Sequence, residues 1–561
     1  MKKKVLAVLL TAAMTVTCLA GCGSSTFQSA DVVEATEAGT GEAASATAVA
    51  SGSDTLTIGL NQEPISLDSA FAYDFTTNPV VNQITESLLY YGENDAIENG
   101  LCESWEEVDG LTYVYNVRSD VTFSDGTPMT MEDVMFSIER YQDPAVASYL
   151  AWMYANVESI EQTGDWQFTV HLSQADALWK HTFATTAGQI HSKAYVEAHP
   201  DDYGTPEGGV LGTGPYVFDS WDVGNQIVLT ANENYWNKDV TPQIKTVVFK
   251  IVTEDTTRVM ASTSNQMDIN LFTPVEMLDN VKENADVTLQ SIPSWGLRFI
   301  SFNCKKAPFD DANVRRAISY ALDDTSLQTE LIKEYGEGTT SNGIPVPESL
   351  FLFDKEDWTA YQTDNCPPYT FDVDKAKEAL AASAYPDGFD CELTIDERSI
   401  DNSLGLYIQQ SLAAIGINVT INKVSNDELV SLQFGSGIDA DGVRPYDFAL
   451  FEWSADFPDP SGNLTPLYAS SNTGDGGSNS CAYENPELDE LLLQQAASTD
   501  DVERTQLMLQ AIDIINADVP NYVYMHQNWL FTVNNRVTGG VADLTGAWFW
   551  NFYVKNVTVS E

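Results

Sequence analysis

The sequence predicts a two-lobed α/β protein, and three observations support this fold class. The chain of 561 residues is too long for one ordinary domain. Its hydrophobic content of 43% is that of a folded protein with substantial cores. Strand-like alternation dominates before about residue 300, whereas helices alternate with strands after it, so we expect a β-rich lobe, an α/β lobe and a cleft between them.

The N-terminus has the organisation of a lipoprotein signal. Lys2 to Lys4 form a positive segment, Val5 to Thr17 a short apolar one, and Leu19-Ala20-Gly21-Cys22 supplies small residues for cleavage. We expect residues 1–21 to be a signal peptide, Cys22 to carry lipid, and the Ala/Ser/Thr/Gly/Glu-rich residues 22–53 to be a flexible tether. No later stretch is long and apolar enough for a membrane span, so lipid alone would anchor the protein to the cell membrane on its extracytoplasmic face.

The first half of the folded body reads mainly as strands with a few helices. Thr130 is a candidate N-cap, and Val134, Ile138 and Tyr141 then share one helical face. The expected strands are 54–60, 111–118, 166–172, 227–229, 246–252 and 267–269, and the expected helices are 82–91, 130–141 and 255–265.

The second half has the alternation of an α/β lobe. Leu404, Ile408, Leu412 and Ile415 mark a helix that ends at Gly416 and is followed by a strand, which is the joint of an α/β unit. The other expected helices are 314–322, 376–380, 488–497 and 502–517, and the other expected strands are 417–421, 448–451 and the aromatic segment around 548–550.

Charge and cysteine content exclude several functions. With 82 acidic against 27 basic residues, the chain lacks the basic face that nucleic-acid binding requires. Beyond the signal and Cys22, the scattered cysteines predict neither a zinc site nor a disulfide framework, although one bridge is possible outside the cell and the sequence does not say which. These residues are Cys102, Cys304, Cys366, Cys391 and Cys481.

The sequence predicts neither an enzyme nor a cofactor site. The five histidines form no H-E-x-x-H motif, and the chain has no nucleophile elbow and no phosphate loop. Gly212-Thr213-Gly214 is followed by Pro215 and lacks the third glycine of a dinucleotide site. Asp439 to Gly442 lacks the remaining ligands of a calcium loop, so we expect no metal.

One stretch, Asp447 to Pro460, carries the strongest hint of a binding site. A strand-like apolar run is followed by Trp453 and Asp456. A carboxylate at the end of a buried strand is costly unless something positive meets it, and a rigid aromatic beside it would shape a wall for the same ligand. The alternative is that Asp456 caps the following turn.

Several stretches resemble, in order, the peptide/nickel class of extracytoplasmic solute-binding proteins, which are the oligopeptide- and dipeptide-binding components of ABC importers. Leu19 to Cys22 resembles the bacterial lipobox, and Gly100 to Trp105 resembles G-L-A-E-S-W with Cys102 in place of the usual alanine. The last match is Trp453 to Pro460, which resembles W-x-A-D-Y-x-D-P. The stretches between them are Val121 to Pro128, Glu132 to Ser137, Gly212 to Tyr216, Asn234 to Trp236, Phe302-Asn303, Pro308-Phe309 and Val314 to Ile318.

The resemblance implies a type II two-lobed binding-protein fold with an extra subdomain in the first lobe. It places lobe I at 54–93, 211–297 and 524–561, the subdomain at 94–210, and lobe II at 298–523. The chain then crosses twice between the lobes, and these crossings form a hinge that lets them close on a ligand.

The resemblance also implies roles for four residues. In peptide-binding members the acid of W-x-A-D pairs with the ligand α-ammonium, and here this acid is Asp456. Trp453 would line the cleft, and Trp295 is a second candidate for its wall. Arg398 lies where dipeptide binders place an arginine for the ligand carboxylate, with a surface salt bridge as the alternative. The arginine that some oligopeptide binders carry six residues before the acid is Leu450 here.

The function implied by the resemblance is a monomeric, lipid-anchored receptor without enzymatic activity, which captures peptides and delivers them to an ABC permease and its ATPase. A receptor of the same fold for a nickel chelate or an oligosaccharide is one alternative, and a secreted hydrolase or adhesin is another. A signalling role, with a peptide pheromone as ligand, also stays open.

Overall fold

The computed structural model describes residues 54–327, 329, 344–366, 368–541 and 544–560. The predicted signal peptide, Cys22 and tether lie outside the described residues. Among the described helices, none is both long enough and apolar enough to cross a membrane.

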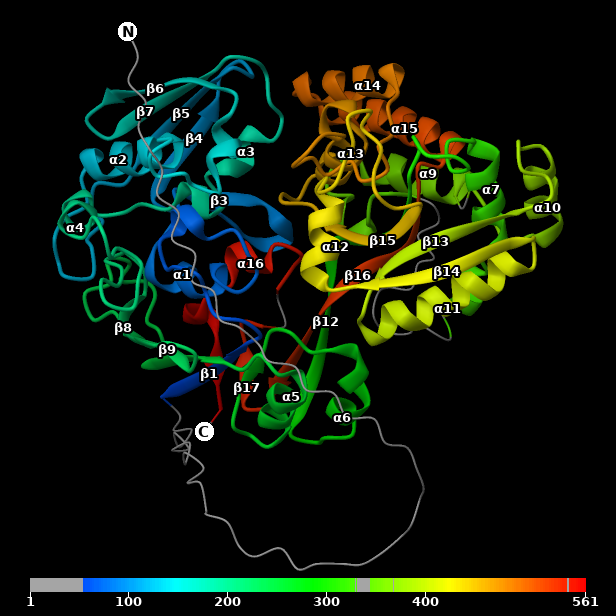
Figure 1. Ribbon diagram of the computed structural model, residues 1–561. Coiled ribbons are helices and arrows are strands. Elements are labelled where there is room, and N and C mark those ends of the chain that lie inside the picture. The colour runs from blue at the N-terminus through cyan, green and yellow to red at the C-terminus, as the bar shows by residue number, and fades with distance from the viewer. Residues whose placement is uncertain (1–53, 328, 330–343, 367, 542–543, 561) are drawn as a thin grey trace, which may run out of the picture. The chain divides into compact units, whose positions relative to one another are not determined.

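A ten-stranded sheet organises the described chain, and its strand order is β14-β13-β15-β12-β16-β11-β1-β10-β9-β8 (Figure 1). Parallel pairs occur on both sides of its middle: β13 with β14 and β15, and β1 with β10 and β11. The strands of this sheet are β1 (Thr55–Leu60), β8 (Tyr216–Asp222), β9 (Gln226–Ala231), β10 (Thr246–Ile251), β11 (Ile269–Asn270), β12 (Val287–Phe302), β13 (Phe389–Asp396), β14 (Ile417–Val424), β15 (Phe448–Ser454) and β16 (Asn521–Asn534).

Two long antiparallel strands join the two halves of this sheet. β12 pairs with β16 from Val287 opposite Asn534 to Ser301 opposite Asn521, and its register shifts after Pro293 and again after Arg298. β12 also pairs with β15, which sets Arg298 opposite Glu452. Neither long strand was predicted from the sequence. Pro293 and Gly296 interrupt the pattern of the first, and the second is buried along most of its length, so that polar and apolar residues do not alternate along it.

A second, four-stranded antiparallel sheet has the order β4-β5-β7-β6. Tyr113, Tyr115 and Val117 of β5 alternate into its core, as their spacing predicted. Its strands are β4 (Cys102–Glu107), β5 (Thr112–Val117), β6 (Val157–Gly164) and β7 (Gln167–Leu172), and two short pairs are β2 (Leu89–Tyr91) with β3 (Ile97–Asn99) and β17 (Val537–Gly539) with β18 (Thr558–Val559).

Helices form close to the predicted ranges 130–141, 255–265, 314–322, 376–380, 404–415, 488–497 and 502–517, and the structure adds others that the sequence did not predict. Thr130 and Asp133 form a capping box at the start of α2. The α-helices are α1 (Asn78–Ile84), α2 (Met131–Gln142), α3 (Trp179–Thr182), α4 (Lys193–Ala198), α5 (Asp255–Thr263), α6 (Leu278–Lys282), α7 (Ala312–Ala321), α8 (Asp324–Ser326), α9 (Lys355–Asn365), α10 (Val373–Ala381), α11 (Ser399–Ala413), α12 (Asn426–Gln433), α13 (Ser461–Tyr468), α14 (Pro486–Ala497), α15 (Asp501–Asp518) and α16 (Trp548–Asn551).

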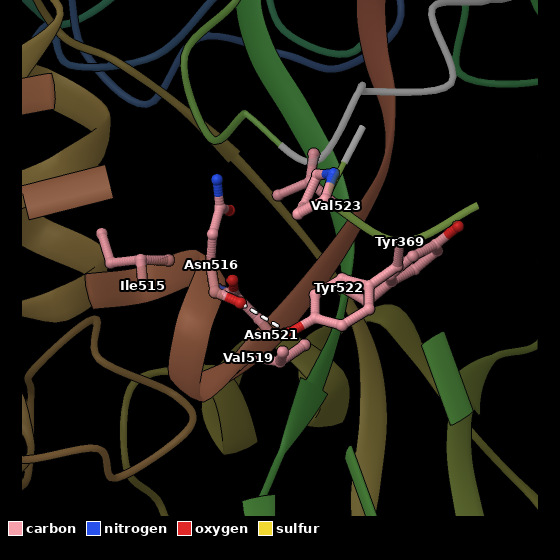
Figure 2. A pocket seen from close by; sticks show the side chains of 8 residues that line it. Tyr369, Ile515, Asn516, Val519, Asn521, Tyr522 and Val523 are labelled. Atoms are coloured by element: carbon pink, nitrogen blue, oxygen red, sulfur yellow. Dashed lines mark hydrogen bonds between the residues drawn. The ribbon is translucent and has the colours of Figure 1, made fainter. Parts of the chain in front are cut away.

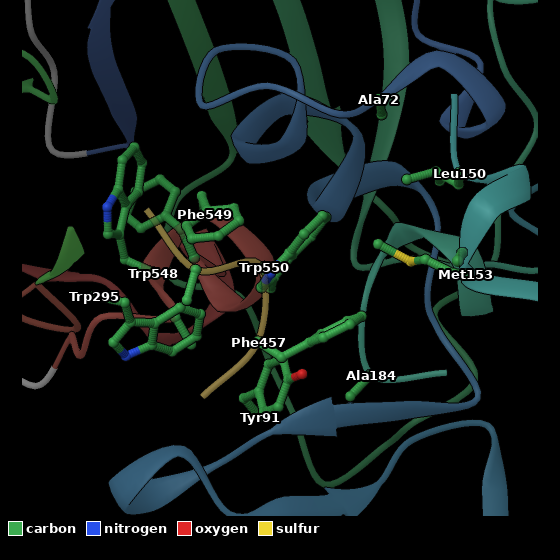
Figure 3. Packing of buried hydrophobic residues seen from close by; sticks show 14 of the residues in the cluster. Ala72, Tyr91, Leu150, Met153, Ala184, Trp295, Phe457, Trp548, Phe549 and Trp550 are labelled. Carbon is green, nitrogen blue, oxygen red and sulfur yellow. The ribbon is translucent and has the colours of Figure 1, made fainter. Parts of the chain in front are cut away.

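Two predicted elements were wrong. The segment 82–91 is not one helix, because α1 ends at Ile84 and the chain returns as strand β2. The aromatic segment at 548–550 is the short helix α16 and not a strand. Its rings pack on several sides at once, so the strand propensity of Trp and Phe gives way to tertiary packing (Figure 3).

The buried Glu86 shows what two of the recognised sequence stretches do structurally. Its carboxylate accepts hydrogen bonds from the Thr213 hydroxyl at 2.9 Å, the Tyr235 hydroxyl at 2.6 Å and the Trp236 indole at 2.7 Å. Thr213 comes from the G-T-G-P-Y stretch, and the two aromatic residues come from N-Y-W. These stretches therefore satisfy the hydrogen-bonding capacity of a buried acid.

Candidate functional site

Strand β15 leads directly into the stretch that the sequence singled out. Phe448 to Phe451 are buried, and Glu452 is the first exposed residue of the strand. Trp453 is half-buried, and its indole nitrogen donates a hydrogen bond to the Gly462 carbonyl at 3.0 Å. The indole is therefore held in place by the first turn of α13, as a rigid wall residue would need to be.

The Asp456 carboxylate has one polar side-chain neighbour and no cationic partner among the described residues. The Tyr73 hydroxyl donates a hydrogen bond of 2.7 Å to it. Protein surrounds most of the carboxylate, although part of the residue still meets solvent. This burial raises the pKa of Asp456 to about 6, and the Tyr73 hydrogen bond only partly opposes the increase.

The backbone of this loop is fixed by contacts from distant parts of the chain. The Trp550 indole donates to the Asp456 carbonyl at 2.8 Å. The neighbouring Phe457 ring lies 5.8 Å from that of Trp152 and 5.6 Å from the imidazole of His181. Asp456 is thus presented by a rigid loop, which is what a preorganised charge requires.

Asp459, and not Asp456, caps the turn that follows the strand. Its carboxylate accepts hydrogen bonds from the backbone amide and hydroxyl of Ser461 at 2.9 and 2.6 Å. Arg504 binds the same carboxylate through both terminal nitrogens at 2.8 Å, and both side chains are 1% exposed. Burial would raise the pKa of Asp459, but Arg504 outweighs it and lowers the value to about 2. No local pattern predicts this pairing, because the partners are 45 residues apart in the chain.

Arg398 lies in a cluster of charges. Its Nε is 2.9 Å from Asp396 and 3.1 Å from Asp401, and its Nη1 is 3.7 Å from Glu452. Its side chain is 41% exposed, whereas both aspartates are almost completely buried. Arg398 therefore already has carboxylate partners, which agrees with the alternative of a salt bridge. The most distant of these partners is Glu452.

Sequence reasoning missed the second arginine of this cluster. Arg298 of β12 is 6% exposed and lies 3.0 Å from Asp401 and 3.4 Å from Glu452. Burial would raise the pKa of Glu452, but Arg298 and then Arg398 outweigh it and bring that pKa below its usual value. The signal that could have found it is a charged residue between the apolar residues Leu297 and Phe299.

Trp295 is completely buried in this conformation (Figure 3). Its ring centroid lies 5.9 Å from that of Phe549 and 6.5 Å from that of Tyr91. The indole therefore packs in an aromatic core, and its role as a wall of the ligand cleft stays a prediction.

Two pockets of the described chain lie elsewhere. One, lined by Tyr369 and the chain around Asn521, has a volume of about 20 Å³ and holds at most one water molecule (Figure 2). The other has about 300 Å³ and is lined by Glu86, Arg118 and Lys555 among others. None of the four predicted binding residues lines either of them.

The fold is that of a two-lobed α/β protein, and the acid without a cationic partner among the described residues gives it a candidate binding site. A family described as bacterial extracellular solute-binding proteins, family 5 middle, matches residues 96–475. The chain belongs to this family, because the match covers more than half of it.

Relatives of known name are similar over nearly the whole chain. The probable D,D-dipeptide-binding periplasmic protein DdpA of Escherichia coli K12 is 31% identical over 504 residues, which cover 87% of this chain and 91% of that protein. The glutathione-binding protein GsiB of E. coli O1:K1 is 27% identical over 486 residues, with 86% and 90% covered.

Solved structures confirm the two-lobed α/β fold. DppA from Helicobacter pylori in complex with the peptide STSA superposes with a TM-score of 0.72 at 23% identity, covering 90% of this chain and 98% of that one. The substrate-binding protein CtaP of Listeria monocytogenes superposes with a TM-score of 0.76 at 21% identity, with 90% and 99% covered.

Proposed function

We propose that this protein captures short peptides outside the cell and delivers them to the permease of an ABC importer, and that Asp456 holds the peptide α-ammonium. The observation that carries the proposal is a carboxylate on a rigid loop that has no cation of its own. A peptide amine is mostly protonated at neutral pH and would supply the missing charge. The names of DdpA and GsiB, a dipeptide binder and a binder of glutathione, support a peptide ligand.

Two lobes joined by β12 and β16 suit this task. In the proposal the predicted boundaries hold: lobe I at 54–93, 211–297 and 524–561, the subdomain at 94–210, and lobe II at 298–523. The two long strands would then form the hinge, and a ligand that contacts both lobes would favour the closed state. Cys22 would carry the lipid that keeps the receptor at the membrane while it exchanges peptides with the permease.

The other end of the peptide is proposed to reach Arg398. A ligand carboxylate would replace Glu452, which is the most distant of the three acids around this arginine and is 45% exposed. Asp396 and Asp401 would keep the guanidinium in place during this exchange. Trp453 would line the space between the two anchors.

Isothermal titration calorimetry with matched peptides tests both anchors. Free di- and tripeptides should bind, N-acetylated peptides should bind at least tenfold more weakly, and Asp456→Asn should remove this difference. Asp441→Asn, which changes an exposed acid of another loop, is the control. Equal affinity for free and acetylated peptides would overturn the amine anchor. Binding of nickel chelates or cello-oligosaccharides instead of peptides would overturn the ligand class.

C-terminally amidated peptides test Arg398 separately. Arg398→Met should weaken the binding of a free-acid peptide and leave that of its amide unchanged. Arg118→Met is a matched control, because Arg118 is also partly exposed and paired with an aspartate. A loss of affinity that is equal for acid and amide would show that Arg398 contacts another part of the ligand or only its protein neighbours.

A further inference from the structure

Two cysteines that are far apart in the sequence lie against each other in the fold. Cys304 follows the end of β12 by two residues, and Cys481 lies in the segment between α13 and α14. The backbone amide of Cys304 donates a hydrogen bond of 2.9 Å to the Cys481 carbonyl. Such a bond places the two Cα atoms about 5–6 Å apart, which is the span of a disulfide.

Flanking residues hold the two segments in this register. The hydroxyls of Ser301 and Ser480 are 2.9 Å apart, on one side of the cysteine pair. On the other side, Lys305 forms an ion pair of 2.6 Å with Glu484. A bridge between the cysteines would therefore need little backbone movement, which is the usual obstacle to forming one.

The two thiols differ in environment and influence each other. Cys304 is partly accessible and its thiol lies 3.5 Å from the Phe302 carbonyl oxygen, whereas Cys481 is completely buried and its thiol donates a hydrogen bond of 3.2 Å to Asn479 Oδ1. Burial would raise the pKa of Cys304, but the neighbouring Cys481 thiol and the Arg315 guanidinium bring it below its ordinary value. Burial, together with Cys304 itself, raises the pKa of Cys481. Cys304 is thus the thiol that reacts first, and Cys481 the one that resolves.

The remaining described cysteines lack such a partner. Burial is the first cause that raises the pKa of each of these thiols, to about 12 for Cys366 and Cys391, and no second thiol acts on any of them. The sequence allowed a bridge between any two of five cysteines. The fold brings one pair together.

We propose that Cys304 and Cys481 form a disulfide when the protein is outside the cell, where oxidising conditions permit it. With a small-molecule disulfide as oxidant, the Cys304 thiolate attacks one sulfur and releases one small thiol. The Cys481 thiolate then attacks the Cys304 sulfur of the mixed disulfide and releases the second thiol. The protein loses two protons and two electrons, and the small disulfide is reduced to two thiols.

Thiol counting and mass spectrometry on the full mature chain test the proposal. After equilibration with oxidised glutathione and removal of the excess, wild-type protein denatured without reductant should show three free thiols in place of the five among Cys102, Cys304, Cys366, Cys391 and Cys481. Peptide mapping should join the peptides that contain Cys304 and Cys481. The melting temperature of the oxidised protein should exceed that of the reduced protein, because the bridge constrains the unfolded chain.

Single substitutions separate this pair from the others. Cys304→Ser should keep all four remaining thiols free, Cys481→Ser should retain a glutathione adduct on Cys304, and the control Cys391→Ser should still form the bridge. If the wild-type protein keeps five free thiols, or if mapping joins another pair, the proposal is wrong. The wild-type measurement decides this even if a serine variant fails to fold.

Discussion

Two acids three residues apart in the loop after β15 have opposite environments. Asp459 is fully buried and bound by Arg504 through two hydrogen bonds, and its pKa is lowered to about 2. Asp456 is partly accessible and accepts one side-chain hydrogen bond, from Tyr73, and its pKa is raised to about 6. The protein compensates the charge of the first acid itself, whereas no cation among the described residues meets the second.

This difference separates one sequence motif into an acid that stabilises the fold and the acid that we propose to bind the ligand. Both acids belong to the same recognised stretch, and both follow a buried strand. Only the distant partners, Arg504 for one and Tyr73 for the other, distinguish them. Neutralising the paired acid should lower the free energy of unfolding, whereas neutralising the unpaired acid should raise it above pH 6.

The largest expected effect is on the stability of the Asp459 pair. Asp459→Asn should lower the free energy of unfolding by about 3–5 kcal/mol, because it leaves the Arg504 charge buried without its partner. Urea denaturation measures this loss, with Asp475→Asn on an exposed loop as control. The double variant Asp459→Leu with Arg504→Met should recover part of the stability. Equal stability of Asp459→Asn and the control would contradict a structural role for this pair.

The next effect concerns the pH dependence of binding through Asp456. A bound ammonium favours the charged carboxylate, whereas below about pH 6 the free protein holds this acid protonated. Peptide affinity should therefore fall about tenfold between pH 7 and pH 5. Calorimetry at several pH values measures this decrease, and it should vanish in Asp456→Asn. An affinity that is independent of pH in the wild-type protein would argue against the ion pair.

A smaller effect is expected on the stability of the ligand-free protein. The folded-state pKa of Asp456 is above its unfolded value of 3.8, so its contribution to stability is complete below pH 3.8 and is lost as pH rises through about 6. Asp456→Asn should therefore stabilise the protein at pH 8 by about 1 kcal/mol, after allowance for the partial solvent exposure. Urea denaturation at pH 8 and pH 4 tests the sign, and the gain should disappear at pH 4. Destabilisation at pH 8 would mean that Asp456 has a structural partner.

The smallest effect is expected for Tyr73→Phe. Loss of the hydroxyl should change the free energy of unfolding by only about 0.5 kcal/mol, because water can replace it at this partly accessible carboxylate. The pKa of Asp456 should rise further, so the weakening of peptide binding should begin at a higher pH than in the wild-type protein. Calorimetric pH profiles of the two proteins compare these onsets, and identical profiles would show that Tyr73 does not tune Asp456.

Much of the fold could be predicted from local patterns. The helix that begins after Thr130 and the helix that ends before Gly416 both form where the sequence predicted them. The prediction failed where packing outweighs local preference, as in α16, and where long strands carry no simple alternation, as in β12 and β16. The candidate site was only partly predictable: Asp456 and Trp453 follow from one short stretch, but Tyr73 and Arg298 come from elements distant in sequence.

By itself, the sequence determined the α/β class and the acidic composition, and its ordered motifs pointed to the family. It also identified the loop that carries Asp456 as a candidate site. These features could be predicted because residues close together in the chain determine them. Tertiary structure alone decided which acid of that loop has its own arginine, which acids surround Arg398, and which two of the scattered cysteines meet. Charge compensation and thiol contact depend on distances of a few ångströms between segments up to hundreds of residues apart, and no local pattern encodes those distances.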